Sequence, residues 1–249
     1  MTDLPAEAYT SPEVFDWEME HFFEEGWVFL GHGDELSTPG DQRAFRIGKE
    51  SVLLLRDRDG RLSGVYNTCR HRGHELLEPG SARNLGAIKC PYHAWVYGLD
   101  GALRAAPSFG EVEGFDRSDY SLVPVGLQGW GGALFVNASG HAPPLESLVG
   151  AVGELVAPAL MEGMSVGATR VFEIDANWKT VTVNHLLTNE IYRLGTGGQE
   201  AGETPHYGVF PGLLLGLHPE YVATYRIEPL EPGRTRVERR RLIPVQAAD

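Results

Sequence analysis

The spacing of apolar residues near the start of the chain is helical. Residues 11–25 begin with Ser11 and Pro12, which are typical of an N-cap and a first helical position. Large apolar side chains recur along one side of this segment: Phe15, Trp17, Met19, Phe22 and Phe23. We therefore predict a helix over 11–25 that packs these side chains into the core.

Between residues 27 and 137 the pattern changes to short apolar runs separated by Gly, Asp and Pro. These runs are 27–31, 43–48, 51–57, 62–67, 86–90, 94–98 and 132–137. Asp-Gly pairs at 59–60 and 100–101 are typical of tight hairpin turns. The pattern predicts an all-β unit, which we place at residues 26–140.

The rest of the chain mixes helical and extended patterns. A small, polar, Pro-containing stretch over 138–147 suggests a boundary or linker. After it we expect a helix near 145–157, a strand over 168–176, helical spacing over 177–190, and strands at 207–217, 220–228 and 234–243. The expected fold is α+β, with the all-β unit beside a second unit made of residues 1–25 and 141–249.

Composition limits the classes of function. The 249 residues are 42% hydrophobic and 22% charged, as in soluble globular proteins, and the net charge is −13. Because a polyanion binds basic surfaces, we expect no nucleic-acid partner. No run approaches the ~20 apolar residues of a membrane span, and the first residues do not resemble a secretory signal. We expect no membrane association and a cytoplasmic location.

The two cysteines belong to a motif with mixed ligands. Cys69-Arg70-His71 and Cys90-Pro91-Tyr92-His93 are separated by 18 residues. Residues i and i+2 of an extended segment point to the same side, so Cys69 and His71 can reach one inorganic centre. Two thiolates and two imidazoles are the ligand set of a Rieske [2Fe–2S] cluster.

A structural zinc ion is the main alternative for these ligands. Zinc sites also use two Cys and two His, but they typically have C-x2–4-C and H-x3–5-H spacing. Here each half of the motif mixes the two ligand types. We predict a [2Fe–2S] cluster held by Cys69, His71, Cys90 and His93, with zinc and a metal-free site as alternatives. Tyr92 and Trp95 either shield this cluster or are ordinary core aromatics.

The residues around the motif are more basic than the rest of the chain. Between positions 69 and 104, five basic residues outnumber three acidic ones: Arg70, Arg72, Arg83, Lys89 and Arg104 against Glu75, Glu78 and Asp100. A basic rim around a redox centre would steer an acidic electron donor toward it. The alternative is ordinary solvated surface charge.

The segment CRHRGHELLEPGS…CPYHAWVYGLDG, residues 69–101, resembles the Rieske domain of the α subunits of Rieske non-haem iron oxygenases. This family contains the aromatic-ring-hydroxylating dioxygenases and the choline- and carnitine-type monooxygenases. The stretches 24–32, 66–73, 177–179 and 210–221 are similar to the family as well, and Ala94 stands where the family most often has Gly. The resemblance implies a Rieske domain beside a helix-grip catalytic domain. It also implies a ferredoxin or flavin reductase as electron donor. For the assembly, it implies either a homo-oligomer, which by resemblance would be a trimer, or a complex with a full-length α subunit.

The family's mononuclear Fe(II) site is not matched in this sequence. The family signature E-N-x-x-[DE]-x-Y-H-x4-H, which follows NWK, supplies a bridging acid and two histidine ligands. These three positions carry Leu187, Glu190 and Gly195 here. We therefore expect a shortened helix-grip domain that lacks the family's iron ligands. His185, Glu190 and His206 form the one candidate set for a displaced second iron, and no catalytic residue is assigned.

Three functions follow from these expectations. The first is an oxidoreductase that only transfers single electrons, its oxygenase centre having been lost. The second is an active Rieske mono- or dioxygenase that hydroxylates a small organic substrate at a rewired iron site. The third is a redox sensor or interaction subunit. The iron content of the protein distinguishes the first two.

Overall fold

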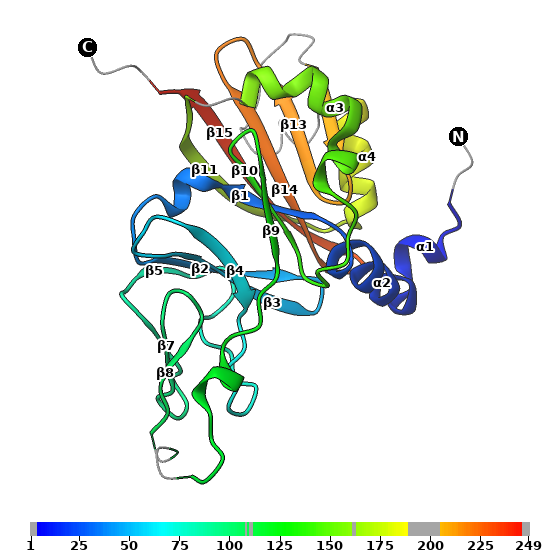
Figure 1. The fold of residues 1–249 in the computed structure, drawn as a ribbon. Helices are drawn as coiled ribbons and strands as arrows, with labels where there is room; N and C mark the ends of the chain where they lie inside the picture. Colours follow the sequence, from blue (N-terminus) through cyan, green and yellow to red (C-terminus); the bar gives the residue numbers. More distant parts are fainter. Residues whose placement is uncertain (1–3, 108, 110–111, 161–162, 189–204, 246–249) are drawn as a thin grey trace.

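The computed structural model describes residues 4–107, 109, 112–160, 163–188 and 205–245. In these residues the fold is mostly β-strand with few helices, which confirms the expected α+β class (Figure 1). None of the helices in the described ranges is long and apolar enough to cross a membrane.

The segment 27–137 forms three antiparallel sheets. The first has the order β4-β3-β2-β5, the second β6-β7-β8 and the third β1-β10-β9. Their strands are β1 (Val28–His32), β2 (Asp41–Ile47), β3 (Glu50–Arg56), β4 (Leu62–Tyr66), β5 (Ala82–Asn84), β6 (Ile88–Lys89), β7 (Val96–Tyr97), β8 (Leu103–Ala105), β9 (Gly126–Trp130) and β10 (Ala133–Asn137). Each predicted run became a strand. The strands β5, β8 and β9 were not predicted, because they are short or rich in Gly and polar residues.

The second half forms one antiparallel sheet with the strand order β11-β15-β14-β13-β12. The strands are β11 (Met164–Ile174), β12 (His206–Val209), β13 (Leu213–Leu217), β14 (Val222–Glu231) and β15 (Arg234–Pro244). The helices α3 (Leu145–Leu160) and α4 (Trp178–Thr188) lie to one side of this sheet (Figure 1). The predicted stretch 207–217 is two strands, because a turn at 210–212 divides it.

The N-terminal segment contains α1 (Glu7–Thr10) and α2 (Pro12–Glu18), and it continues as a π-helix, η1 (Met19–Glu24). Ser11 caps α2 as expected, since its hydroxyl accepts a hydrogen bond from the Val14 N–H. We predicted that the whole aromatic face of the helix over 11–25 would be buried, and this prediction was wrong at one position. Trp17 is half exposed and stacks on the His21 ring instead of entering the core. Two short 3-10 helices, η2 (Gly33–Leu36) and η3 (Arg117–Tyr120), complete the helical elements of the described residues.

Two of the hydrophobic clusters matter for the site. One is continuous from the β unit into the second sheet and includes Leu30, Phe45, Trp178 and Tyr225. Another surrounds the two cysteines and includes Trp95, Tyr97 and Leu103. The cysteine loops therefore have a core of their own, while the first cluster ties the two halves of the molecule together.

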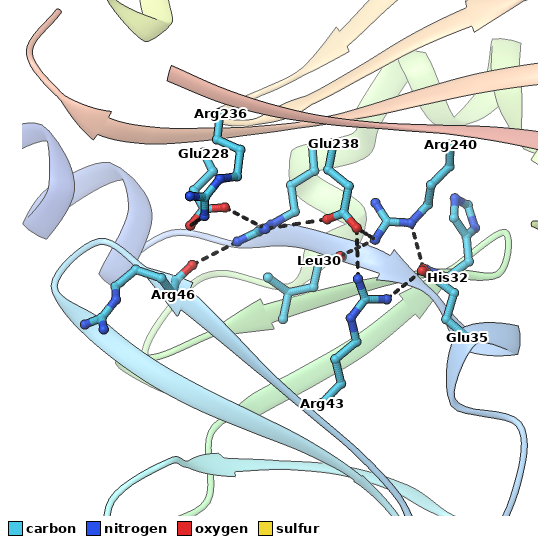
Figure 2. A network of polar contacts seen from close by, with 10 residues as sticks. Leu30, His32, Glu35, Arg43, Arg46, Glu228, Arg236, Glu238 and Arg240 are labelled. Carbon is cyan, nitrogen blue, oxygen red and sulfur yellow. Dashed lines mark hydrogen bonds and ion pairs between the residues drawn. The ribbon is translucent and has the colours of Figure 1, made fainter. Parts of the chain in front are cut away.

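Buried ion pairs also join the two halves (Figure 2). Arg43 on β2 contacts Glu35 at 2.6 Å and Glu238 on β15 at 2.8 Å. Arg240, which has no exposed surface, contacts Glu35 at 2.7 Å and Glu238 at 2.8 Å. Because buried charges are tolerated only when they are paired, these four side chains fix how β2 lies against β15.

Candidate iron–sulfur site

The first ligand loop closes through two backbone hydrogen bonds. The Cys69 N–H donates to the His74 carbonyl at 2.8 Å, and the Gly73 N–H donates to the Cys69 carbonyl at 2.9 Å. Gly73 has a φ of 73°, a left-handed conformation that Gly adopts without strain. This tight loop carries His71 at its centre, two residues after the cysteine.

The second ligand loop repeats this pattern. The Cys90 N–H donates to the Trp95 carbonyl at 2.8 Å, and the Ala94 N–H donates to the Cys90 carbonyl at 3.1 Å. Ala94, four residues after the cysteine, again has a left-handed φ, of 58°. The two loops therefore present their cysteines in the same way, and they differ mainly in whether histidine is the second or third residue after the cysteine.

The four predicted ligands lie together. The rings of His71 and His93 are 4.7 Å apart between centroids, and Cys69 and Cys90 are both buried and not disulfide-bonded. Burial raises the pKa of the Cys69 thiol, and the neighbouring Cys90 raises it further. In the absence of metal the thiol form is therefore favoured, and metal binding would displace its proton.

His71 offers a nitrogen that fits an iron. Its Nδ1 is buried and has no hydrogen-bond partner among the described residues. One face of the ring stacks on Trp95, with centroids 4.8 Å apart and planes 7° from parallel. Burial, with a smaller contribution from His93, lowers the pKa of His71, which favours the neutral imidazole that a metal ligand must present.

The arrangement fits two metal ions better than one. In the part of the chain that the structure describes, no three His, Cys, Asp or Glu side chains are arranged around a single metal position. One zinc ion would need all four ligands around it. A Rieske cluster takes only two protein ligands on each iron, so the donor set fits [2Fe–2S].

Tyr97 also contributes to the cluster site, although the ligand motif gave no indication of it. Its hydroxyl lies 3.2 Å from Cys69 Sγ and accepts a hydrogen bond from the Arg70 N–H at 3.0 Å. Because the oxygen already accepts from Arg70, its own proton is directed to the sulfur. Burial and the contact with Cys69 raise the pKa of Tyr97, which keeps that proton in place. Its position on β7, 28 residues from Cys69, gave no local sequence signal.

The two predicted shielding aromatics behave differently. Trp95 is buried and covers His71, and it is itself surrounded by Phe109, Phe115 and Tyr120. Tyr92 is 60% exposed, although its ring lies 3.8 Å from that of His93. Trp95 thus excludes water from one side of the site, whereas Tyr92 belongs to its outer surface.

The candidate second iron site stays a prediction, because the structure describes only two of its three members. His185 Nε2 and His206 Nδ1 are 3.1 Å apart, within hydrogen-bond distance of each other. Burial, followed by the influence of His206, lowers the pKa of His185 to about 3, and burial also lowers that of His206. The third member, Glu190, lies outside the described residues, as does Gly195.

Residues 26–116 match the family model of the Rieske [2Fe–2S] domain. The chain is 36% identical over 194 residues to the carnitine monooxygenase oxygenase subunit of Acinetobacter pittii, which covers 77% of this chain and 51% of that one. It is 33% identical to the glycine betaine monooxygenase oxygenase subunit of Chromohalobacter salexigens, over 73% of this chain and 40% of that one.

The chain belongs to the Rieske oxygenase family. It spans about half the length of the curated relatives it matches. The crystal structure of the apo form of a quaternary ammonium Rieske monooxygenase superposes with a TM-score of 0.83 at 27% identity, covering 99% of this chain and 76% of that one. A naphthalene 1,2-dioxygenase from Rhodococcus sp. has a TM-score of 0.82 at 24% identity, over 99% of this chain and 74% of that one, which shows a shared fold. The family and its Rieske cluster are thus confirmed, whereas the boundary expected near residue 140 stays a prediction.

Proposed function

We propose that this Rieske protein passes single electrons from a reductase partner toward an oxygen-activating iron, as part of a monooxygenase that acts on a small quaternary ammonium compound. The observation that carries the proposal is the pair of matched ligand loops, which bring Cys69, His71, Cys90 and His93 together. The substrate class is supported by the names of the relatives, which are carnitine and glycine betaine monooxygenase subunits.

The residues of the site have distinct roles in this proposal. Cys69 and Cys90 hold one iron as thiolates, and His71 and His93 hold the other through imidazole nitrogen. When bound, the cluster supplies one-electron chemistry at a potential between ≈ −150 and +300 mV, which the neutral imidazoles raise above that of an all-cysteine cluster. Tyr97 donates a hydrogen bond to the Cys69 sulfur, and Trp95 keeps water from one face of His71.

Two forms of this function differ in where oxygen is activated. In the first, this chain itself carries out the monooxygenase reaction, and its relatives support this form more strongly. In the second, the chain is an electron carrier without an oxygenase centre, which was our first expectation from the sequence and is not confirmed. This second form is favoured by Glu190 and Gly195, which stand where the family has its two histidine ligands.

Iron and acid-labile sulfide should be counted per chain on anaerobically purified protein, alongside EPR of the reduced sample and an assay with L-carnitine and glycine betaine. Two irons, two sulfides and a Rieske signal are expected, the content of one cluster. A further tightly held iron with substrate-dependent oxygen consumption would identify the oxygenase form. Two irons without any product would identify the carrier form. Zinc without labile sulfide would contradict both.

The partner assignments are also part of the proposal. A reductase, either a ferredoxin or a flavoprotein, is the expected donor, because the cluster needs an external source of electrons. A homo-oligomer, or a complex with a full-length α subunit, is expected from the family. Solution mass measured by light scattering checks the second assignment, and a strict monomer at working concentration would contradict it.

A further inference from the structure

The ring of His71 has no hydrogen bond within the described residues that would fix its plane. Its Nδ1 is buried and without a partner there. The outer side-chain torsion of a histidine has no sharp preferred value, so the rotamer alone does not set the plane either. Histidines that bind metals are usually oriented by a hydrogen bond to the second ring nitrogen. Within this chain, contacts of another kind must orient the imidazole.

Three rings surround that imidazole. Trp95 lies parallel to it, with centroids 4.8 Å apart and planes 7° from parallel. Phe109 and His93 meet it edge-on, with centroids at 5.2 Å and 4.7 Å and planes at 78° and 68°. The parallel contact is kept only while the two planes stay aligned, so the indole and the two edge contacts favour one orientation of the His71 ring.

Trp95 also connects the two ligand loops. Its carbonyl accepts the hydrogen bond from the Cys90 N–H that closes the second loop, and its side chain covers the histidine of the first loop. The indole is 1% exposed. Three further rings meet it edge-on, with centroids 5.3–5.9 Å away: Phe109, Phe115 and Tyr120. The protein itself therefore fixes the indole, and the indole relates the first loop to the second.

Core packing alone does not account for a tryptophan at this position. The Trp95 Nε1 is buried and has no hydrogen-bond partner in the part of the chain that the structure describes. A buried donor without an acceptor destabilises a protein, and an apolar side chain would avoid that loss. The broad, flat face that the indole offers to His71 is a reason to retain it.

The second histidine ligand is held differently. The ring of His93 lies between those of His71 and Tyr92, and the Tyr92 ring is 3.8 Å away and tilted by 34°. Tyr92 is 60% exposed, so His93 lacks a buried stacking partner of the kind that His71 has. The two imidazoles are therefore not equivalent, and the more strongly oriented one is the one beneath Trp95.

We propose that Trp95 is a positioning residue, which holds the His71 imidazole in the plane needed for iron binding and keeps the first ligand loop in register with the second. Trp95 acts through His71 and binds no metal itself. This inference rests on the proposed [2Fe–2S] function of the site and adds the residue that orients one of its ligands.

The test compares two variants of the reduced holoprotein. Trp95→Phe keeps a ring over His71, whereas Trp95→Met fills much of the same space without one. Loss of a group that orients a metal-bound histidine typically costs 10–100-fold in metal affinity. Iron should therefore pass to the chelator ferrozine at least about tenfold faster from Trp95→Met than from Trp95→Phe. The EPR signal of Trp95→Met should also be broadened, because an unrestrained imidazole adopts several planes, while Trp95→Phe should keep nearly the wild-type line shape.

A matched control changes the same aromatic cluster without touching His71. Phe115 meets Trp95 at 5.9 Å and has no ring contact with His71 among the described residues. Phe115→Leu should therefore keep the wild-type line shape and rate of iron release. If Trp95→Met does not fold, Phe109→Leu takes its place, because Phe109 meets both rings. It should then release iron faster than Phe115→Leu.

Three outcomes would overturn the positioning role. They are a wild-type line shape and release rate in Trp95→Met, equal acceleration in Phe115→Leu and the variant that removes a contact with His71, and release from Trp95→Phe as fast as from Trp95→Met. The last result would assign the effect to the indole N–H or its volume instead of the stacked ring. Wild-type protein without labile sulfide or a Rieske signal would instead overturn the proposed function itself.

Discussion

Ala94 occupies in the second ligand loop the position that Gly73 occupies in the first. Each residue lies four positions after its cysteine, donates its N–H to that cysteine's carbonyl and has a left-handed φ, 73° for Gly73 and 58° for Ala94. A side chain with a Cβ is strained in this conformation by about 1–2 kcal/mol. The tight loop therefore holds Ala94 in a conformation that the residue alone does not favour.

Replacing Ala94 with Gly should stabilise the protein. The left-handed strain disappears, and part of that gain is offset because Gly makes the unfolded chain more flexible. We expect a net increase of about 0.5–1 kcal/mol in the free energy of unfolding, measured by urea denaturation. Gly73→Ala is the matched change in the other loop and should destabilise by a similar amount. A less stable A94G variant would show that the methyl group of Ala94 makes a favourable contact that outweighs its strain.

Removing the Tyr97 hydroxyl should lower the reduction potential of the cluster. A hydrogen bond to a cluster sulfur stabilises the more negative, reduced state, and Tyr97 provides one at 3.2 Å from Cys69 Sγ. With about 1 kcal/mol for the bond, Tyr97→Phe should shift the one-electron potential by about −40 mV. A redox titration followed by EPR measures the shift. Tyr92→Phe removes an exposed hydroxyl and should leave the potential nearly unchanged, and equal shifts in the two variants would exclude the Tyr97 bond as the cause.

The parts of the site that sequence predicted are local, and the parts it missed are distant in sequence. Cys69 with His71, and Cys90 with His93, are two or three residues apart, so their spacing alone restricts the metal that they hold. Tyr97 reaches Cys69 only after β7 has formed, and no spacing rule connects the two. The exposure of Tyr92 likewise depends on how the second loop meets the surface.

The same distinction applies to the fold. Alternating patterns and Asp-Gly turns located the strands, because both features act over a few residues. Arg43 and Glu238 are 195 positions apart, and each would be placed on the surface by its composition alone. Their burial follows from how β2 and β15 pack, which a pattern within one strand does not contain. The hydrogen bond between His185 and His206 arises in the same way, from α4 meeting β12.

Neutralising Glu238 should strongly destabilise the protein. Glu238 contacts both Arg43 and Arg240 at 2.8 Å, and Arg240 has no exposed surface. Glu238→Gln keeps the shape but leaves buried guanidinium charge uncompensated, which typically costs about 3–5 kcal/mol. Chemical denaturation measures the loss. Glu173→Gln, in a pair with Arg236 whose side chains are about 40% exposed, should cost less than about 1 kcal/mol. Similar losses in the two variants would show that the network of Figure 2 contributes no more than a surface pair.

Stability should decline as the pH falls from 6.5 toward 4, and His32 should cause part of that decline. Burial, followed by the nearby charge of Arg240, lowers the pKa of His32 from 6.5 to about 4. A lowered pKa in the folded state means that the unfolded chain binds the proton first. The stability that neutral His32 contributes is therefore complete above pH 6.5 and is lost progressively as the pH falls toward 4.

The expected loss from this one group between pH 6.5 and 5 is about 2 kcal/mol, at 1.36 kcal/mol per pH unit. Glu35 should add to the decline at lower pH, because Arg240 and Arg43 outweigh the effect of its burial and lower its pKa. The contribution of Glu35 is present above the ordinary carboxyl pKa and is lost as the pH falls through the lowered value.

The variant His32→Asn tests the role of His32, because asparagine retains an N-cap acceptor for η2 but does not titrate. The free energy of unfolding of this variant should therefore be less dependent on pH between 6.5 and 5 than that of wild type, by about the same 2 kcal/mol. Parallel pH profiles for the two proteins would show that His32 is protonated in the folded state, and hence that β1 and β14 are less tightly packed around it than its 5% exposure indicates.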